Sequence, residues 1–157
     1  MKLARIGSRG PGWKADDLSG AGAALSPGRW NQEGERVVYA AIHAALAVLE
    51  TVAHIQAHGL PIHRYLVEID VPARVWARRR VIAPDELPRG WDAIPHTEVS
   101  RQYGSHWYVR GEQALLELPS AIVPEERIVL IHAAHPDTAT LRARIVRPFD
   151  YGSVLRS

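Results

Sequence analysis

The alternation of apolar and polar positions predicts both strands and helices in this chain. The short β-branched run "RVVYAA" (residues 36–41) predicts a strand. Residues 42–59 place apolar side chains at helical spacing up to a glycine, and a proline follows soon after, so they predict the clearest helix of the chain. The core-facing stripe expected for that helix consists of Ile42, Leu46, Leu49 and Ala53.

The remaining segments alternate between strand and loop patterns. Residues 64–72 alternate apolar and polar side chains as a half-buried strand does, and "VWAR" (75–78) suggests another short strand. Residues 8–35 are rich in glycine and residues 83–95 are rich in proline, so both read as long ordered loops. We further expect a broken helix over 96–109 and strands within 114–118, 127–133 and 144–152.

These elements show neither a βαβ alternation nor an internal repeat, so the pattern favours an α+β fold. No linker divides the chain, and 157 residues with 46% apolar side chains suffice for one core. We therefore expect a single domain over residues 1–157.

Composition and charge narrow the functional classes. There is no cysteine, which excludes disulfides and thiolate chemistry. The 19 basic and 17 acidic residues nearly balance, and the one dense basic run is "RVWARRR" (74–80), so direct nucleic-acid binding is not expected. No apolar stretch reaches the roughly 20 residues that span a membrane, and the N-terminus lacks a signal-peptide pattern, so a cytoplasmic location is expected.

Two patterns that often carry chemistry are incomplete here. The glycine-rich "GAGAALSPG" (20–28) has neither the G-x-G-x-x-G register nor a following G-K-[ST], so it predicts no phosphate-binding loop. His54 and His58 lie four residues apart on the predicted helix, but no glutamate stands between them and no third ligand is evident, so we expect no metal site.

Four other side chains each have an ordinary structural interpretation when they are considered one at a time. Arg29 is either a surface arginine or a guanidinium that binds a phosphate or a carboxylate. Glu50 lies beside apolar helix positions, so it is either exposed or a partly buried carboxylate that needs a partner. Ser120, bracketed by prolines, reads as a turn hydroxyl, and Tyr39 reads as a strand aromatic packed in the core.

Five segments taken together change this picture. They are "GRWNQEG" (28–34), "VVYAA" (37–41), "ALAVLE" (45–50), "LELPSAIVPEE" (116–126) and "LIHAAHP" (130–136). In this order and spacing they resemble the RES domain family, which is named for an arginine, a glutamate and a serine. The resemblance implies that these are Arg29, Glu50 and Ser120, that Tyr39 is the accompanying tyrosine, and that Trp30 and Asn31 also bind substrate. The chain departs from the family pattern "ExNxLINPxHP" at Ile128, His132 and Ala133.

The resemblance also implies a fold, a substrate and a partner. The expected core is similar to that of ADP-ribosyltransferases, with a mixed, strongly twisted sheet and flanking helices. The expected protein is the toxin of a type II toxin–antitoxin pair, it uses NAD⁺ as substrate without a metal, and its antitoxin carries a helix-turn-helix-type DNA-binding domain and blocks the active site.

Within that resemblance each residue has an expected role. Glu50 would stabilise the oxocarbenium-like centre that forms when the nicotinamide–ribose bond breaks. Arg29 would bind the pyrophosphate, and Tyr39 would offer a flat face to the nicotinamide ring. Ser120 would hydrogen-bond a ribose hydroxyl or the carboxamide and fix its orientation.

The acceptor of ADP-ribose is open at this point. The proline-rich loop 83–95, with Trp91, would make a semi-rigid rim that docks a protein, so transfer to a specific bacterial protein is favoured over transfer to water or phosphate. Two other classes stay possible. One is a nucleotide- or RNA-binding module that uses residues 74–80, and the other is an endoribonuclease toxin that uses His132 and His135.

Overall fold

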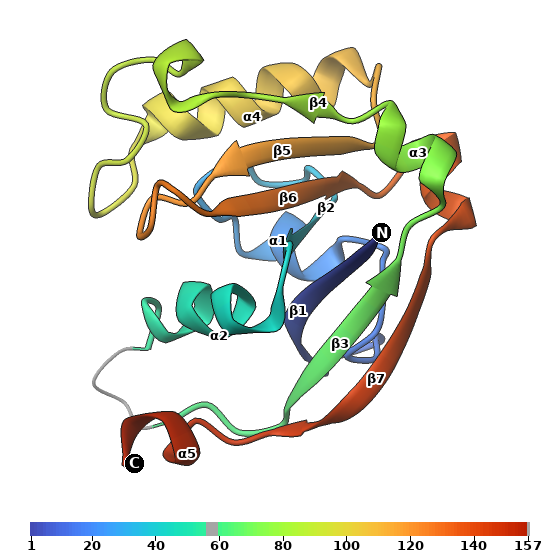
Figure 1. Cartoon of the computed structure of the whole chain (residues 1–157), viewed down its shortest axis with the longest axis vertical. Helices are drawn as coiled ribbons and strands as arrows, with labels where there is room; N and C mark the ends of the chain where they lie inside the picture. The colour runs from blue at the N-terminus through green and yellow to red at the C-terminus, as the bar shows by residue number, and fades with distance from the viewer. Residues whose placement is uncertain (56–59, 157) are drawn as a thin grey trace.

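The computed structural model describes residues 1–55 and 60–156. Their strands are β1 (Lys2–Ser8), β2 (Val37–Ala41), β3 (Arg64–Asp70), β4 (Arg80–Val81), β5 (Leu115–Pro119), β6 (Arg127–His132) and β7 (Arg142–Phe149). All seven form one sheet in the order β4-β5-β6-β2-β1-β3-β7. Only β4 and β5 pair in parallel, so the sheet is mixed. Figure 1 shows β5 and β6 running across the direction of β1, β3 and β7, as a strong twist requires.

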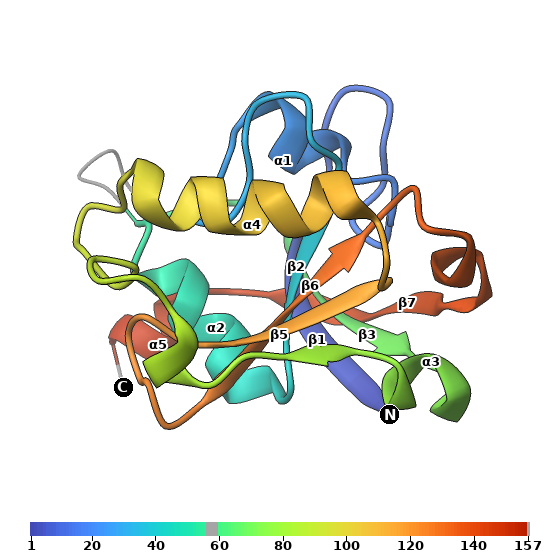
Figure 2. The same cartoon turned by 90° about the horizontal axis from the view of Figure 1, so that it is seen from above.

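Short helices flank this sheet. They are α1 (Ala21–Leu25), α2 (Ala44–Val52), α3 (Ala73–Ala77), α4 (Glu98–Arg110) and α5 (Gly152–Leu155), with 3₁₀ turns η1 (Pro84–Glu86) and η2 (Pro136–Thr140). Both views place α4 alongside the end of the sheet that contains β5 and β6 (Figures 1 and 2). The expected α+β class with a mixed, twisted sheet and flanking helices is confirmed. Within the described ranges, every helix is too short or too polar to cross a membrane.

Two sequence predictions of secondary structure are wrong. Residues 75–78 do not form a strand, because Pro72 ends β3 and stands at the start of helix α3. The guanidinium of Arg79 lies over the ring of Trp76 at 3.9 Å, a contact that helical i, i+3 spacing permits. The expected break in the 96–109 helix is also absent: α4 is continuous through Gly104.

Helix α2 is shorter than the apolar pattern predicts. It ends at Val52, and residues 56–59, where the predicted helix would finish, lie outside the described part of the chain. The predicted stripe is correct for Leu46, but Leu49 is 38% exposed and Ala53 is exposed as well. Ile42 precedes the helix and packs against the cluster on the other face of the sheet. Within α2 the buried residues are Leu46 and Ala47, on the side of the helix that contacts β1 and β2.

Strand β1 was not predicted, although it lies in the interior of the sheet. Lys2 and Arg5 interrupt its apolar pattern, so the sequence gives only a weak strand signal there. In the structure β1 pairs with β2 on one side and with β3 on the other. It therefore joins the half of the sheet that carries the β2–α2 connection to the half that ends in β7.

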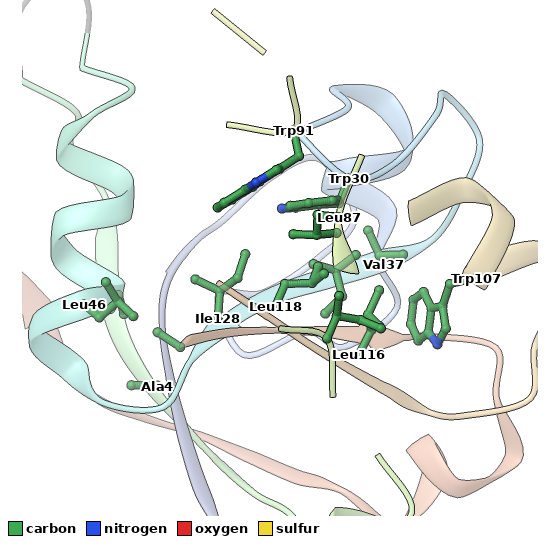
Figure 3. Packing of buried hydrophobic residues seen from close by; sticks show 14 residues of the cluster. Ala4, Trp30, Val37, Leu46, Leu87, Trp91, Trp107, Leu116, Leu118 and Ile128 are labelled. Carbon is green, nitrogen blue, oxygen red and sulfur yellow. The ribbon is translucent and has the colours of Figure 1, made fainter. Parts of the chain in front are cut away.

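The core lies on both faces of the sheet, as alternating side chains dictate. Along β2, Val37 and Ala41 belong to one buried cluster and Val38 and Ala40 to the other. Figure 3 shows the first cluster, in which Leu46 of α2 lies on the same side of the sheet as a group of three tryptophans and several aliphatic side chains. The members labelled there are Ala4, Trp30, Val37, Leu46, Leu87, Trp91, Trp107, Leu116, Leu118 and Ile128.

Candidate functional site

The loop that carries Arg29 is held by the side chain of Asn31. Its Oδ1 accepts hydrogen bonds from the backbone N–H of Gly28 at 2.9 Å and from the hydroxyl of Tyr39 at 2.7 Å. Its Nδ2 donates to three backbone carbonyls, of which Ala23 O is the nearest at 2.9 Å. Asn31 is fully buried, so all of its hydrogen-bonding capacity is used inside the protein.

Tyr39 completes this support from strand β2. Its hydroxyl accepts from the backbone N–H of Trp30 at 3.0 Å while it donates to Asn31. Burial raises the pKa of Tyr39 far above its ordinary value, so the hydroxyl stays protonated. A side chain on Gly28 would put its Cβ 2.8 Å from that hydroxyl, which explains the glycine before Arg29.

Helix α4 packs directly against the same loop. A Cβ on Gly104 would lie 1.8 Å from the carbonyl oxygen of Trp30, so the helix can approach this closely only because residue 104 has no side chain. The rings of Trp30 and Trp91 stack with centroids 6.1 Å apart, as Figure 3 shows. Ser105 of α4 also donates to the carboxylate of Glu35 at 2.7 Å. The loop is thus fixed from β2, from α4 and from the segment around Trp91.

This framework presents the guanidinium of Arg29 in a defined orientation. One nitrogen, Nη1, donates to the carbonyl oxygens of Trp91 at 2.9 Å and Ala93 at 2.8 Å. Nε and Nη2 make no hydrogen bond to any residue in the described part of the chain, so they are available to a ligand. Partial burial lowers the pKa of Arg29, and the negative charges of Glu50 and Asp92 oppose that shift. The group stays cationic, because arginine does not lose its proton in proteins.

Glu50 and Ser120 come together from α2 and from the turn after β5. The hydroxyl of Ser120 donates to Oε1 of Glu50 at 2.5 Å. The same oxygen of Ser120 accepts from the backbone N–H groups of Ile122 at 3.0 Å and Val123 at 3.1 Å. The serine is therefore held by two donors while it orients one oxygen of the carboxylate. The structure joins Glu50 to Ser120 directly and places Arg29 within electrostatic reach of Glu50.

Four of the residues expected at the substrate have contacts within the protein. Ser120 is fully buried and its hydroxyl donates to Glu50, so we propose that it orients the carboxylate. Asn31 and Trp30 are also buried, at 0% and 1% exposure, and they belong to the supporting framework of the Arg29 loop. Tyr39 is half-buried, and its hydroxyl serves the loop as well.

The segment that departs from the family pattern has a structural role. Ile128 is buried in the core cluster beside α2. His132 is 7% exposed, hydrogen-bonds the carbonyl oxygen of Tyr108 through Nε2 at 3.0 Å and stacks on the Tyr108 ring at 4.2 Å. His135 caps the turn η2. These contacts give no support to a catalytic pair of histidines.

Sequence reasoning missed the residues that surround Arg29 and Glu50. The carbonyl groups of Trp91 and Ala93 could not be found from motifs, because every residue has a backbone carbonyl and residue type does not show which of them accepts a hydrogen bond. His96 lies within electrostatic reach of Arg29, and burial lowers its pKa; its Nδ1 is buried without a partner among the described residues. The proline-rich composition of residues 83–95 was the one signal in the sequence that pointed to this segment.

A groove of about 340 Å³ runs between α4 and strands β4 and β5, and its lining includes Tyr103 and Trp107. Arg29, Glu50 and Ser120 do not line this groove, so the candidate site is a separate place on the described part of the chain. Among the described residues, no three His, Asp or Glu side chains are arranged to hold a metal ion; His58, the partner considered for His54, lies outside that part.

Most of the chain is similar to several known proteins. The RES domain family model matches residues 2–152. A protein of Sphingobium sp. (strain YBL2) named Prs ADP-ribosylating toxin is 52% identical over 147 residues, which cover 94% of this chain and 91% of that protein. Toxin Res of Photorhabdus laumondii is 34% identical over 76% of this chain and 74% of its own length.

Among solved structures, the Mycobacterium tuberculosis MbcT–MbcA toxin–antitoxin complex contains a chain with the same fold. The TM-score is 0.64 at 18% identity, over 94% of this chain and 84% of that one. A match to the family model over almost the whole sequence, together with relatives of this identity and coverage, is decisive for the family. The chain belongs to the RES domain family.

Proposed function

We propose that this protein is the toxin of a toxin–antitoxin pair and that it cleaves the nicotinamide–ribose bond of NAD⁺ and transfers the ADP-ribose. The observation that carries the proposal is the contact of the Glu50 carboxylate with Ser120, whose hydroxyl oxygen lies 2.5 Å from Oε1 of Glu50. The positive charge of Arg29 also acts on this carboxylate. The names of its relatives support the same reaction class, because the Sphingobium protein is an ADP-ribosylating toxin.

The chemistry asks for one carboxylate at the reacting carbon. When the bond between the ribose C1′ and the nicotinamide nitrogen breaks, the bonding electrons leave with nicotinamide and positive charge builds on C1′ and the ring oxygen. A carboxylate beside this centre stabilises the transition state more than the ground state. Glu50 has one oxygen fixed by Ser120, so its second oxygen is free to face C1′. The acceptor then adds to C1′ and loses its proton.

Arg29 matches the other charged part of NAD⁺. The pyrophosphate carries two negative charges, and the free Nε–H and Nη2–H groups of a guanidinium form a fork that fits two phosphate oxygens. Since Nη1 is held by the carbonyls of Trp91 and Ala93, the fork needs little ordering when a ligand binds. We expect Arg29→Ala to weaken NAD⁺ binding by about 1.5 to 3 kcal/mol, the usual contribution of a hydrogen bond to a charged group. Calorimetry with the two purified proteins measures this loss, and an unchanged Kd would move the phosphate site elsewhere.

A specific bacterial protein is the acceptor that we propose, with water as a slower alternative. The segment that contacts Arg29 also contains Ile94, which is 80% exposed, so an apolar side chain stands at the rim where a target would dock. The test is incubation of the purified protein with adenylate-labelled NAD⁺ and bacterial lysate. One or a few labelled protein bands support transfer to a protein. Label found only in free ADP-ribose or its phosphate would contradict that transfer and would show that the protein degrades NAD⁺. Label that stays in intact NAD⁺ refutes both.

The toxin role is tested in cells. The proposed partner is an antitoxin with a helix-turn-helix-type domain, and the fold shared with a chain of a toxin–antitoxin complex is consistent with such a partner. Expression of this protein alone in the bacterial cytoplasm, where we place the reaction, should stop growth, and co-expression of the antitoxin should restore it. Normal growth with both wild type and Glu50→Gln would contradict the toxin role.

A further inference from the structure

His43 and Glu126 form a link between helix α2 and the turn that holds Ser120. The β2–β6 ladder pairs Ala41 with Ile128, and its continuation brings the backbone N–H of Ile42 to the carbonyl oxygen of Arg127 at 3.4 Å. One more residue along the same register places His43 opposite Glu126. Their side chains meet there, with Nε2 of His43 2.8 Å from Oε2 of Glu126.

The imidazole of His43 serves both partners in one tautomer. Its Nδ1 accepts a hydrogen bond from the backbone N–H of Leu46 at 3.2 Å and so caps the start of α2. Because Nδ1 is an acceptor, the proton of the neutral ring lies on Nε2, which donates it to Glu126. An asparagine at this position could cap the helix equally well but could not reach across to Glu126 in the same way.

Glu126 in turn closes the turn that contains Ser120. Its carbonyl oxygen accepts from the backbone N–H of Ser120 at 2.9 Å, and its own N–H donates to the carbonyl oxygen of Val123 at 2.8 Å. Ser120 then donates to Glu50, seven residues along the chain from His43 on the same helix segment. The contacts form a closed ring that runs from His43 to Glu126, Ser120, Glu50 and back along α2.

We propose that His43 and Glu126 are positioning residues for Glu50: their link fixes α2 relative to the Ser120 turn and so sets where the carboxylate stands at the reacting carbon. This inference rests on the proposed NAD⁺ cleavage. The His43 and Glu126 side chains are 47% and 39% exposed. A pair this exposed contributes little to stability, so its loss should leave the protein folded, and a change in rate would then report the position of Glu50.

Loss of the link between His43 and Glu126 should lower kcat because it displaces Glu50. A 1 Å misplacement of a reacting group costs about a hundredfold in rate, so partial release of α2 should lower kcat about three- to tenfold. The KM for NAD⁺ should stay within about twofold, because Arg29 lies on a separate loop. Glu126→Ala and His43→Asn should both show this effect. The variant with both changes should lose no more than either single variant, since each alone already breaks the link.

The experiment measures nicotinamide release and thermal unfolding for wild type, these three variants and two controls. Glu126→Gln keeps an oxygen that can accept from Nε2, so it should retain wild-type kcat. Glu112→Ala removes an exposed ion pair, with Arg110 at 2.7 Å, that touches no residue of the ring, so it should also match wild type. Unchanged kcat in Glu126→Ala and His43→Asn, or losses that add in the double variant, would overturn this inference alone. A wild-type protein that releases no nicotinamide would overturn the proposed function together with it.

Discussion

Replacing Gly104 by alanine should destabilise the protein although it improves a helix. Alanine in a helix interior is favoured over glycine by about 1 kcal/mol. The new Cβ, however, would lie 1.8 Å from the carbonyl oxygen of Trp30, where real Cβ atoms keep at least 3.0 Å. The clashing atom is backbone in a buried loop, so it cannot rotate away, and overpacking of this kind costs about 3 kcal/mol.

The net loss of about 2 kcal/mol corresponds to a Tm lower by about 4 to 8 °C for a domain of this size. Trp30 follows Arg29 directly, so the same displacement should raise the KM for NAD⁺ about threefold or more. Gly22→Ala is the matched control, because its Cβ would meet only the ring of Trp13 at 3.9 Å and should leave Tm unchanged or slightly raised. Calorimetric melting of the three proteins decides the matter. A Gly104→Ala variant that melts at or above wild type would refute the close approach of α4 to the Arg29 loop.

Two further perturbations test the loop and the buried histidine. Asn31→Ala leaves the N–H of Gly28, the hydroxyl of Tyr39 and the carbonyl of Ala23 without their partner. Urea unfolding should therefore show a free energy of unfolding lower by about 3 kcal/mol or more. A decrease of less than about 1 kcal/mol would contradict this hydrogen-bond network. Burial lowers the pKa of His132 below its ordinary value of 6.5, so the unfolded chain binds the proton more readily. Stability should therefore decrease as the pH falls below about 6.5 and be fully present above it. His132→Asn should flatten that pH dependence, and an equal slope in the variant would assign it to other groups.

The sequence predicted β2, β3, β5, β6 and β7, and it failed where the determining contacts are distant along the chain. Strand β2 was predicted from its β-branched run and β3 from the local alternation of its side chains. Strand β1 was missed because its burial comes from two partners, β2 and β3, that no local pattern reveals. The break expected within residues 96–109 is absent, and nothing nearby in the sequence shows that the Trp30 backbone occupies the space beside Gly104.

Contacts between distant residues also explain why the sequence identified candidate site residues but not their contacts. Arg29, Glu50 and Ser120 could be named from their motifs, because a family resemblance carries residue identity. The role of each residue could not be predicted, because it depends on which hydroxyl contacts which carboxylate after folding. Ser120 was expected to bind the substrate, and in the structure its hydroxyl donates to Glu50.

Nicotinamide release by wild type and by Glu50→Gln shows whether the Glu50 carboxylate drives cleavage of NAD⁺. Glutamine keeps the size of the side chain and still accepts the hydrogen bond from Ser120, so Tm should change little while the negative charge is lost. We expect steady nicotinamide release by wild type and a rate lower by about a hundredfold or more in a folded Glu50→Gln variant. Release at the wild-type rate by that variant would contradict this role of Glu50.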